Sequence, residues 1–510
     1  MTSGLKTSLN VKSVGQIYKN RFEPDKVALI FKGRQWTYAE FDDAVIAYAN
    51  FFRGLGLKPG ERVILNTPNN PEFIFTYLGV VRNAAVIVPV NPMLTLRELS
   101  FTAEDSGAKY MVIHASVLER IGLEKKGLAD ELGVEVIVLG EEFSERVSKS
   151  PREDFDLVDD PQTISTYLYT SGTTGTPKAA MLSHYNLTVN AMQTNTAFDT
   201  DDSDRYILVL PLFHVLAFTC VTLMPLGTGA TVDLVEAFRP KEFISELIEN
   251  RITVFIGVPA MYVVLVNAGK QHVEFPDLRR VICGGAPLPL DTIRGMQEGL
   301  GLEVVEGYGL TEASPACLFN PIHGVHKAGS VGFPFPLCEC KVVSENGAEL
   351  PAGESGELLV KGPNVMRGYY NRPEENAATI VDGWLHTGDI AQVDEDGYFY
   401  IVDRIKDLII VSGLNVYPRE VEEVLFEHPQ VAEAAVIGEP DKLRGEIAVA
   451  YVVLKEGAGE VHHKEILRFL KERLAQYKLP RRINIIEALP RNSSGKVLKR
   501  MLREQSDSVK

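Results

Sequence analysis

The sequence has few cysteines, no unbroken apolar run of membrane-spanning length and no excess of positive charge. Five of its 510 residues are cysteine: Cys220, Cys283, Cys317, Cys338 and Cys340. Their number and uneven spacing exclude the disulfide framework of a small secreted domain. Cys338 and Cys340 form a C-x-C pair without the second ligand pair that a zinc site needs. We therefore expect reduced thiols in the core or loops of a cytoplasmic protein.

The charge balance and the chain ends restrict partners and location. A formal net charge of −16 disfavours nucleic-acid binding, because such proteins carry basic stripes. The stretch from Ile207 to Leu226 approaches membrane-span length, but Pro211, His214 and Pro225 interrupt it. It predicts a buried strand, a loop and a core helix rather than a transmembrane segment. Neither chain end resembles a signal peptide or a receptor-read address. Peripheral membrane contact and a homodimer are left open.

The order of apolar and turn residues predicts an α/β protein. Hydrophobic content is 45% and charged content 24%, as in ordinary globular proteins. Strand and helix patterns alternate from Ala28 to Leu139, with a capping box at Thr37 and Glu40, which predicts layered, mostly parallel sheets. Short strands and Gly/Pro turns from about 329 to 404 predict a small distorted β-barrel. The chain after this section predicts an α+β domain of about one hundred residues.

A glycine- and hydroxyl-rich loop follows the predicted strand Ile164 to Thr170. It reads Tyr169-Thr-Ser-Gly-Thr-Thr-Gly-Thr-Pro-Lys178. Glycines let backbone N–H groups approach a ligand, while the hydroxyls and Lys178 add donors, so the loop can wrap a phosphate chain. Its spacing differs from the common P-loop. A flexible turn is the alternative, and the phosphate loop is the favoured interpretation.

Two further predicted strands end in glycines beside polar residues. Arg280 to Cys283 leads into Gly284-Gly-Ala-Pro287, and Val304-Val305 leads into Glu306-Gly-Tyr-Gly-Leu-Thr-Glu312. A flat base edge such as adenine could lie against such backbone. Thr311 and Glu312 supply a hydroxyl and a carboxylate, the hard oxygens that Mg²⁺ accepts beside a triphosphate.

His214 and Lys496 each have an alternative structural explanation. His214 follows the predicted strand Tyr206 to Leu210, where α/β folds place ligands, but histidines are also common in cores. Lys496 ends a polar loop and, by residue type alone, would be a solvated surface charge.

Five motifs, in this order, make the chain resemble the adenylate-forming superfamily, in its acyl-CoA synthetase and fatty-acid–CoA ligase branch. They are Tyr169–Lys178, Glu306–Glu312, Thr387-Gly-Asp389, Asp403-Arg-Ile-Lys-Asp407 and Asn492-Ser-Ser-Gly-Lys496. The resemblance extends from about Val27 to Arg500. It implies an AMP-binding domain at 1–404 and a mobile lid domain at 405–510, with the active site between them.

The resemblance also implies roles for individual residues. The ATP β- and γ-phosphates would be held by Thr170, Ser171, Gly172, Thr173, Thr174, Gly175 and Lys178. The adenine pocket would comprise Gly284, Gly285, Ala286, Pro287, Glu306, Gly307 and Tyr308, and Gly309 would also bind ATP. Thr311 would contact the α-phosphate, Glu312 with Thr170 would bind Mg²⁺, and Asp389 with Arg404 would hold the ribose. Lys406 would be the hinge, Ser412 and Gly413 would line the coenzyme A channel, and Lys496 would reach the α-phosphate.

These roles imply ATP-dependent activation of a carboxylic acid as an acyl-adenylate, followed by transfer to coenzyme A. Lys496, Thr311 and His214 are the candidate catalytic residues, and the acyl pocket would comprise His214, Val215, Val258, Met261 and Ala313. No unpaired cation there would select an acidic side group, so we expect an apolar acid, a medium- or long-chain fatty acid. Aryl acids and loading of a carrier protein are alternatives; a luciferase-like oxygenase or a non-catalytic regulator is less consistent with the motifs.

Two departures from the family pattern limit these inferences. Val411-Ser-Gly413-Leu stands where many relatives carry Gly-Gly followed by a polar residue, which affects the details of the thiol channel. The Gly-Glu-Ile-Cys signature of plant aryl-CoA ligases is replaced by Gly356-Glu-Leu-Leu359, which weakens an aryl substrate slightly.

Overall fold

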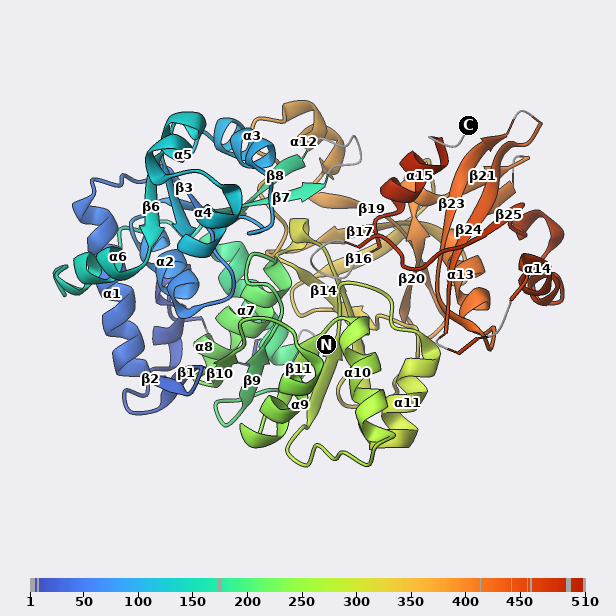
Figure 1. The fold of residues 1–510 in the computed structure, drawn as a ribbon, viewed down its shortest axis with the longest axis horizontal. Coiled ribbons are helices and arrows are strands. Elements are labelled where there is room, and N and C mark those ends of the chain that lie inside the picture. The colour runs from blue at the N-terminus through green and yellow to red at the C-terminus, as the bar shows by residue number, and fades with distance from the viewer. Residues whose placement is uncertain are drawn as a thin grey trace.

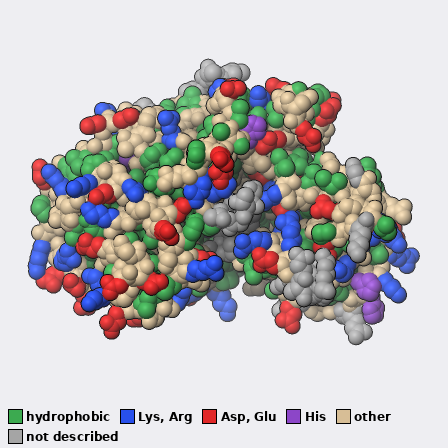
Figure 2. Space-filling view, turned by 90° about the horizontal axis from the view of Figure 1, so that it is seen from above, with side chains coloured by type: hydrophobic (Ala, Val, Ile, Leu, Met, Phe, Trp, Pro, Cys, Tyr) green, Lys and Arg blue, Asp and Glu red, His purple; other side chains and the backbone are tan. Residues whose placement is uncertain are grey.

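The computed structural model describes residues 5–6, 9–171, 177–412, 414–441, 443–455, 457–458, 461–491 and 497–507. Figure 1 shows a larger part, running from the N-terminus to β20, beside a smaller part that carries the C-terminal strands and helices. On the face seen in Figure 2, acidic and basic side chains are interspersed over both parts.

Two sheets with parallel centres form the body of the larger part. The first contains β1 (Val27–Phe31), β2 (Arg34–Thr37), β9 (Arg205–Leu208), β10 (Thr231–Leu234), β11 (Val254–Gly257), β12 (Arg280–Cys283), β13 (Val304–Gly309), β14 (Ala316–Phe319) and β15 (Phe333–Pro334). Its nine strands follow the order β15-β14-β13-β12-β11-β9-β10-β1-β2, and those from β13 to β1 pair in parallel. The second contains β3 (Arg62–Asn66), β4 (Val86–Pro89), β5 (Tyr110–His114), β6 (Glu135–Leu139), β7 (Ile164–Ser171) and β8 (Pro177–Ser183), in the order β6-β5-β3-β4-β7-β8.

Helices cover these sheets and bury their apolar faces in a large shared core. They are α1 (Tyr38–Gly54), α2 (Pro71–Arg82), α3 (Leu96–Ser106), α4 (Ala115–Ile121), α5 (Lys125–Leu132), α6 (Glu141–Ser148), α7 (His184–Phe198), α8 (Met224–Thr228), α9 (Pro240–Glu249), α10 (Pro259–Gly269) and α11 (Leu290–Leu300). Shorter turns are the 3₁₀ helices η1 (Val14–Arg21) and η3 (Thr311–Ala313) and the π-helix η2 (Leu216–Leu223). The predicted capping box is confirmed: the Thr37 hydroxyl accepts from the Glu40 amide, and the Glu40 carboxylate accepts from the Thr37 amide.

The stretch from Ile207 to Leu226 forms the end of β9, a loop, η2 and the start of α8, as the interrupting prolines predicted. Among the described residues, no helix is long and apolar enough to span a membrane.

A half-barrel of antiparallel strands follows the nine-stranded sheet in the chain. It contains β16 (Glu339–Val343), β17 (Ser355–Lys361), β18 (Ile380–Val381), β19 (Trp384–Val393) and β20 (Phe399–Arg404), with α12 (Pro373–Thr379) in the β17–β18 connection. The order is β16-β17-β19-β18, and β20 pairs with β19. The predicted α/β class with a small distorted barrel is therefore confirmed.

The last hundred residues form a fourth sheet with helices and cores of their own. The elements are η4 (Ile405–Asp407), β21 (Ile409–Val411), β22 (Leu414–Val416), α13 (Pro418–Phe426), β23 (Val431–Asp441), β24 (Gly445–Leu454), α14 (His463–Lys471), η5 (Gln476–Lys478), β25 (Arg482–Ile485) and α15 (Lys499–Asp507). The sheet changes between β20 and β21, and the domain boundary at residue 404 stays a prediction.

Candidate active site

The segments predicted to hold the acyl group and adenine lie at the ends of neighbouring parallel strands of the nine-stranded sheet. Because β9, β11, β12 and β13 run in parallel, their carboxyl ends lie along one edge, where open α/β sheets bind ligands. A Cβ placed on Gly285 would lie 3.6 Å from Cγ1 of Val258 and 4.0 Å from Cδ2 of Leu216. One on Gly284 would lie 3.8 Å from the Gly307 carbonyl. The structure therefore brings η2, the residue after β11, the loop after β12 and strand β13 close together.

Tyr308, Asp389 and Arg404 meet although they come from different sheets. The Tyr308 hydroxyl donates to Oδ2 of Asp389, and Nε of Arg404 lies 3.2 Å from Oδ1 of the same carboxylate. Asp389 and Arg404 are cross-strand partners on β19 and β20. Burial and the Asp389 charge raise the pKa of Tyr308, so its hydroxyl stays protonated and donates. An aromatic ring and a carboxylate thus lie side by side. A nucleoside could place its base against such a ring and its ribose hydroxyls against such a carboxylate.

Glu306 lies beside this group, but its side chain is engaged in holding the fold. Its Oε2 accepts from the Gly329 amide at 2.9 Å, and its carbonyl accepts from the Asn320 amide at 3.0 Å. Burial raises the pKa of Glu306 to about 7. Gly309 has no room for a side chain, because a Cβ would lie 2.2 Å from the Pro315 carbonyl.

A second group of charges forms where the β7–β8 hairpin meets η3. The Thr170 hydroxyl lies 3.5 Å from Oε1 of Glu312, and the Tyr369 hydroxyl donates to the same oxygen at 2.7 Å. Thr170 is the cross-strand partner of Lys178. Nζ of Lys178 lies 5.7 Å from the centre of the Tyr369 ring and 3.3 Å from Oε1 of Glu375. A lysine, two carboxylates and two hydroxyls therefore share one small region.

The sequence did not predict Tyr369 or Glu375. Gly368-Tyr-Tyr marked only a turn, and the contact between Tyr369 and Glu312 spans 57 residues without a motif that links them. A third residue, Asp105 on α3, was also missed. Its carboxylate accepts from the Tyr169 hydroxyl at 2.8 Å and pairs with Arg372 at 2.6 Å, which anchors the start of the loop.

The donors at Glu312 fit a magnesium ion that also binds phosphate. Carboxylate and hydroxyl oxygens are hard ligands, and both described hydrogen-bond partners of the Glu312 carboxylate contact Oε1 rather than Oε2. In the described part of the chain no group of three or more His, Cys, Asp or Glu side chains could hold a metal. Mg²⁺ suits such a sparse set, because it keeps waters and takes substrate phosphates as ligands.

His214 is half-buried after β9, and its ring lies 4.5 Å from that of Phe213. Its Nε2 is buried and has no hydrogen-bond partner in the described structure. Burial lowers the pKa of His214 to about 4, so the ring is neutral at pH 7. Of the other predicted acyl-pocket residues, Val258 is half-buried, whereas Val215, Met261 and Ala313 are buried.

A narrow apolar cavity of about 10 Å³ borders His214. Its walls come from α2, β4, β7, α7 and η2, and consist of Tyr77, Pro89, Leu168, Leu187, Leu212, Phe213, Val215 and Phe218. The rings of Tyr77 and Phe218 stack with centroids 3.7 Å apart at this cavity. The cavity is almost closed in this conformation.

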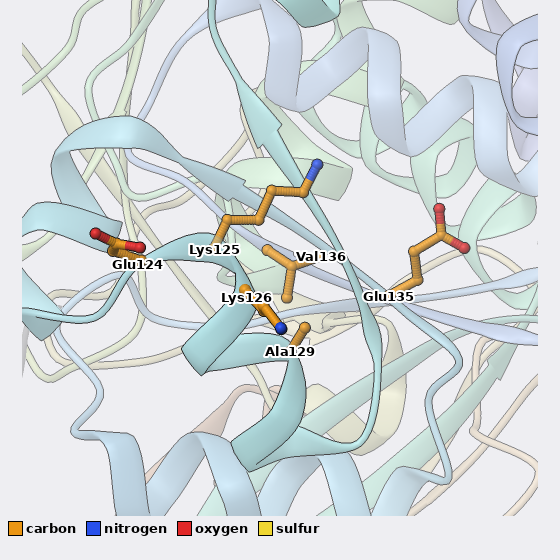
Figure 3. A pocket seen from close by; sticks show the side chains of 6 residues that line it. All are labelled: Glu124, Lys125, Lys126, Ala129, Glu135 and Val136. Carbon is orange, nitrogen blue, oxygen red and sulfur yellow. The ribbon is translucent and has the colours of Figure 1, made fainter.

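A larger hollow of about 500 Å³ lies elsewhere, between α5 and β6 (Figure 3). Glu124, Lys125, Lys126, Ala129, Glu135 and Val136 line it. It is open to solvent, and the site residues predicted from the sequence are not among those that line it. It is therefore not the candidate active site.

The C-terminal candidates lie around η4 and β21. Lys406 is in η4, between the half-barrel and the last sheet, and Asp407 beside it binds Arg503 of α15 at 2.7 Å. Ser412 is exposed, and its amide donates to the Arg444 carbonyl at 2.7 Å. Gly172, Thr173, Thr174, Gly175, Gly413, Lys496 and the Ser171 side chain lie outside the described residues, so their roles stay predictions.

Comparison with known proteins decides the family. Residues 18–370 match the AMP-binding enzyme family, and residues 420–496 match the AMP-binding enzyme C-terminal domain. The chain belongs to the AMP-binding enzyme family. This enzyme is 37% identical to a feruloyl-CoA synthase of Amycolatopsis sp, over 96% of its own length and 98% of that protein. It is 34% identical to a long-chain-fatty-acid–CoA ligase of Bacillus subtilis (strain 168), over 94% and 92% of the two chains.

The fold of this AMP-binding enzyme also matches solved structures of the family. The crystal structure of ATP-bound MatB from Rhodopseudomonas palustris superposes with a TM-score of 0.92 at 32% identity, over 98% of this chain and 99% of that one. The chain is thus an adenylate-forming, AMP-producing acyl-CoA synthetase of a family that uses ATP and coenzyme A.

Proposed function

We propose that the enzyme activates an apolar carboxylic acid, a medium- or long-chain fatty acid, and transfers the acyl group to coenzyme A. The observation that carries this proposal is the apolar lining next to His214, where Leu187, Val215 and Phe218 border a small cavity. The side chains around the small cavity at His214 are mostly apolar, which suits an apolar acid.

Most of the candidate site residues would bind ATP, and Lys496 would act in the chemical step. Asp389 and Arg404 would hold the ribose beside Tyr308, while Thr170, Lys178 and the loop after Thr170 would hold the β- and γ-phosphates. Thr311 would contact the α-phosphate. Mg²⁺ at Glu312 and Thr170 would neutralise phosphate charge. Lys496 would donate to the α-phosphate as the acid carboxylate attacks, which is where negative charge develops.

The small C-terminal part would serve both half-reactions by moving. After adenylation, rotation at Lys406 would withdraw Lys496 and bring Ser412 and Gly413 to the acyl-adenylate. A glycine at 413 would let the pantetheine arm pass close to the backbone. Closure by a domain is a common way to exclude water between steps.

Two substitutions separate the half-reactions. Lys496→Ala should abolish acid-dependent pyrophosphate exchange yet still convert supplied acyl-adenylate to thioester. Gly413→Leu should do the reverse, because its side chain would block the thiol. If Lys496→Ala lost both half-reactions, the adenylation role would be wrong; if Gly413→Leu formed thioester at the normal rate, the channel assignment would be wrong.

An aryl acid is the second candidate, favoured by the 37% identity to the feruloyl-CoA synthase. A panel of saturated fatty acids compared with benzoate, coumarate and ferulate, measured by AMP release with and without coenzyme A, separates the two. We expect the highest kcat/KM for a saturated chain, and a preference for aryl acids would overturn the fatty-acid assignment. Turnover that does not depend on coenzyme A would point instead to an oxygenase or, if it requires an added carrier protein, to that protein as acceptor.

A further inference from the structure

Tyr369 contacts both opposite charges of the candidate phosphate site. Its hydroxyl donates to Oε1 of Glu312 at 2.7 Å, while the centre of its ring lies 5.7 Å from Nζ of Lys178. Burial and the Glu312 carboxylate raise the pKa of Tyr369, so the hydroxyl remains a donor. One side chain therefore offers a hydrogen bond to the anion and a π-face to the cation.

A carboxylate and an ammonium in one half-buried region attract each other strongly, because screening is weaker there than in water. If Glu312 and Lys178 paired, neither would be free for a cation or a phosphate. In the described structure Lys178 instead pairs with Glu375, at 3.3 Å, and Glu312 is bound by Tyr369 and Thr170. The two charges are thus held on separate partners.

The backbone fixes Tyr369 in this position. Its amide donates to Oδ1 of Asn376 at 2.6 Å, and Nδ2 of Asn376 donates back to the Tyr369 carbonyl at 2.8 Å. On either side, the amide of Met181 on β8 donates to the Gly368 carbonyl, and the Tyr370 amide donates to the Ala179 carbonyl, both at 2.9 Å. The ring and hydroxyl are therefore anchored to the β7–β8 hairpin that carries the phosphate loop.

We propose that Tyr369 is a positioning residue for the metal–phosphate site: its hydroxyl orients Glu312 so that Oε2 faces the cation, and its ring keeps Lys178 apart from that carboxylate. This inference rests on the proposed roles of Glu312 and Lys178. Partners that orient a metal-binding carboxylate typically change metal affinity by about 10–100-fold when they are removed.

The test is calorimetric binding of ATP without the acid substrate, so that no turnover occurs. The association constant is measured for Mg·ATP and for ATP in excess EDTA. The first divided by the second is the metal ratio, which reports how much the metal contributes to ATP binding. Tyr369→Phe keeps the ring and removes the hydroxyl. We expect the ratio to fall about tenfold or more, with metal-free ATP binding unchanged. Tyr369→Leu removes the ring as well, and should weaken metal-free ATP binding in addition.

Tyr370→Phe is the matched control, because this neighbouring ring packs against Tyr167, with centroids 4.8 Å apart. It should leave both affinities unchanged. A ratio for Tyr369→Phe equal to that of the wild type would overturn the inference, and so would an equal fall in Tyr370→Phe.

Glu312→Gln distinguishes this failure from failure of the proposed site. If Glu312→Gln lowers the ratio and Tyr369→Phe does not, Glu312 binds the cation and only the inference about Tyr369 is wrong. If neither substitution changes the ratio, the metal role of Glu312 is wrong as well.

Discussion

Arg82 and Lys178 are both buried cations of the larger part, yet their surroundings differ. Arg82 is fully buried and every arm of its guanidinium is engaged: it pairs with Asp154, donates to the Phe155 carbonyl at 2.8 Å and donates to the Tyr18 hydroxyl at 3.2 Å. Lys178 is 8% exposed and has the half-exposed Glu375 as its one described ion-pair partner.

The difference separates structural charge from functional charge. The groups around Arg82 bond to one another and join α2 to the segment at Asp154 and Phe155. The groups around Lys178 are held apart and only partly paired. Groups that are only partly paired can still bind a ligand. We therefore expect substitution of Lys178 to reduce activity rather than stability.

Replacing each cation by methionine tests most directly whether Arg82 serves stability and Lys178 serves activity. Arg82→Met should lower the free energy of unfolding by about 1–3 kcal/mol, because the buried Tyr18 hydroxyl and the Phe155 carbonyl lose their donor, while the exposed Asp154 carboxylate is solvated. Thermal unfolding followed by circular dichroism measures this loss. At 20 °C the folded fraction should keep the wild-type kcat; a large fall in kcat with unchanged stability would contradict the structural role.

Lys178→Met should show the opposite pattern. We expect kcat/KM for ATP to fall about 10²–10³-fold, as for removal of one preorganised charge-stabilising donor, while the unfolding midpoint stays within error. Steady-state kinetics with varied ATP, beside the same unfolding assay, would check it. Strong destabilisation without a change in kcat/KM would show that Lys178, like Arg82, has a structural role.

His184 sharpens the comparison through pH, because it is a buried group far from the charged clusters. Its Nδ1 accepts from the Val14 amide at 3.1 Å, and burial lowers its pKa from 6.5 to about 3. Below pH 6.5 the imidazole of His184 is protonated in the unfolded state but stays neutral in the folded state. The free energy of unfolding therefore falls as the pH falls. The expected loss is about 2 kcal/mol between pH 7 and 5. Urea unfolding should show a shallower pH dependence in His184→Gln; identical slopes would exclude His184 as the cause.

Asp105 is the intermediate case and should give the smallest effect. It is paired with Arg372, as a structural charge would be, but it also anchors Tyr169 beside the phosphate loop. Asp105→Asn should raise KM for ATP about threefold and cost about 1 kcal/mol of stability, because a neutral acceptor keeps part of both contacts. A change in only one of the two measurements would assign Asp105 to one class.

Local patterns predicted the fold well because each depends only on residues within a single helix, strand or turn. Thr37 and Glu40 predicted a helix start, and glycines after β12 and β13 predicted the turns at the sheet edge. Helix α6 was missed because charged residues dominate it, although Phe143 and Val147, one turn apart, are both buried.

Contacts between distant segments limited what could be predicted of the site. Motifs named Asp389 and Arg404 separately, and the structure makes them cross-strand partners. Tyr369 carries no motif of its own, and only the packing of its segment against β8 brings it to Glu312. The loop from Gly172 to Thr176 and Lys496 lie outside the described residues, so their geometry still rests on the sequence.

The pairing of β1 with β10 has a consequence for the order of folding. Leu29 lies opposite Val232, and the Thr231 hydroxyl donates to the Val27 carbonyl across 204 residues of chain. During synthesis at 5–20 residues per second, β1 therefore waits about 10–40 s for its parallel neighbour. Until then β1 and β2 are a lone hairpin, which is marginally stable and has an exposed edge. Strand β1 is thus synthesised long before the strand that secures it, and chaperone capture is expected at its exposed edge.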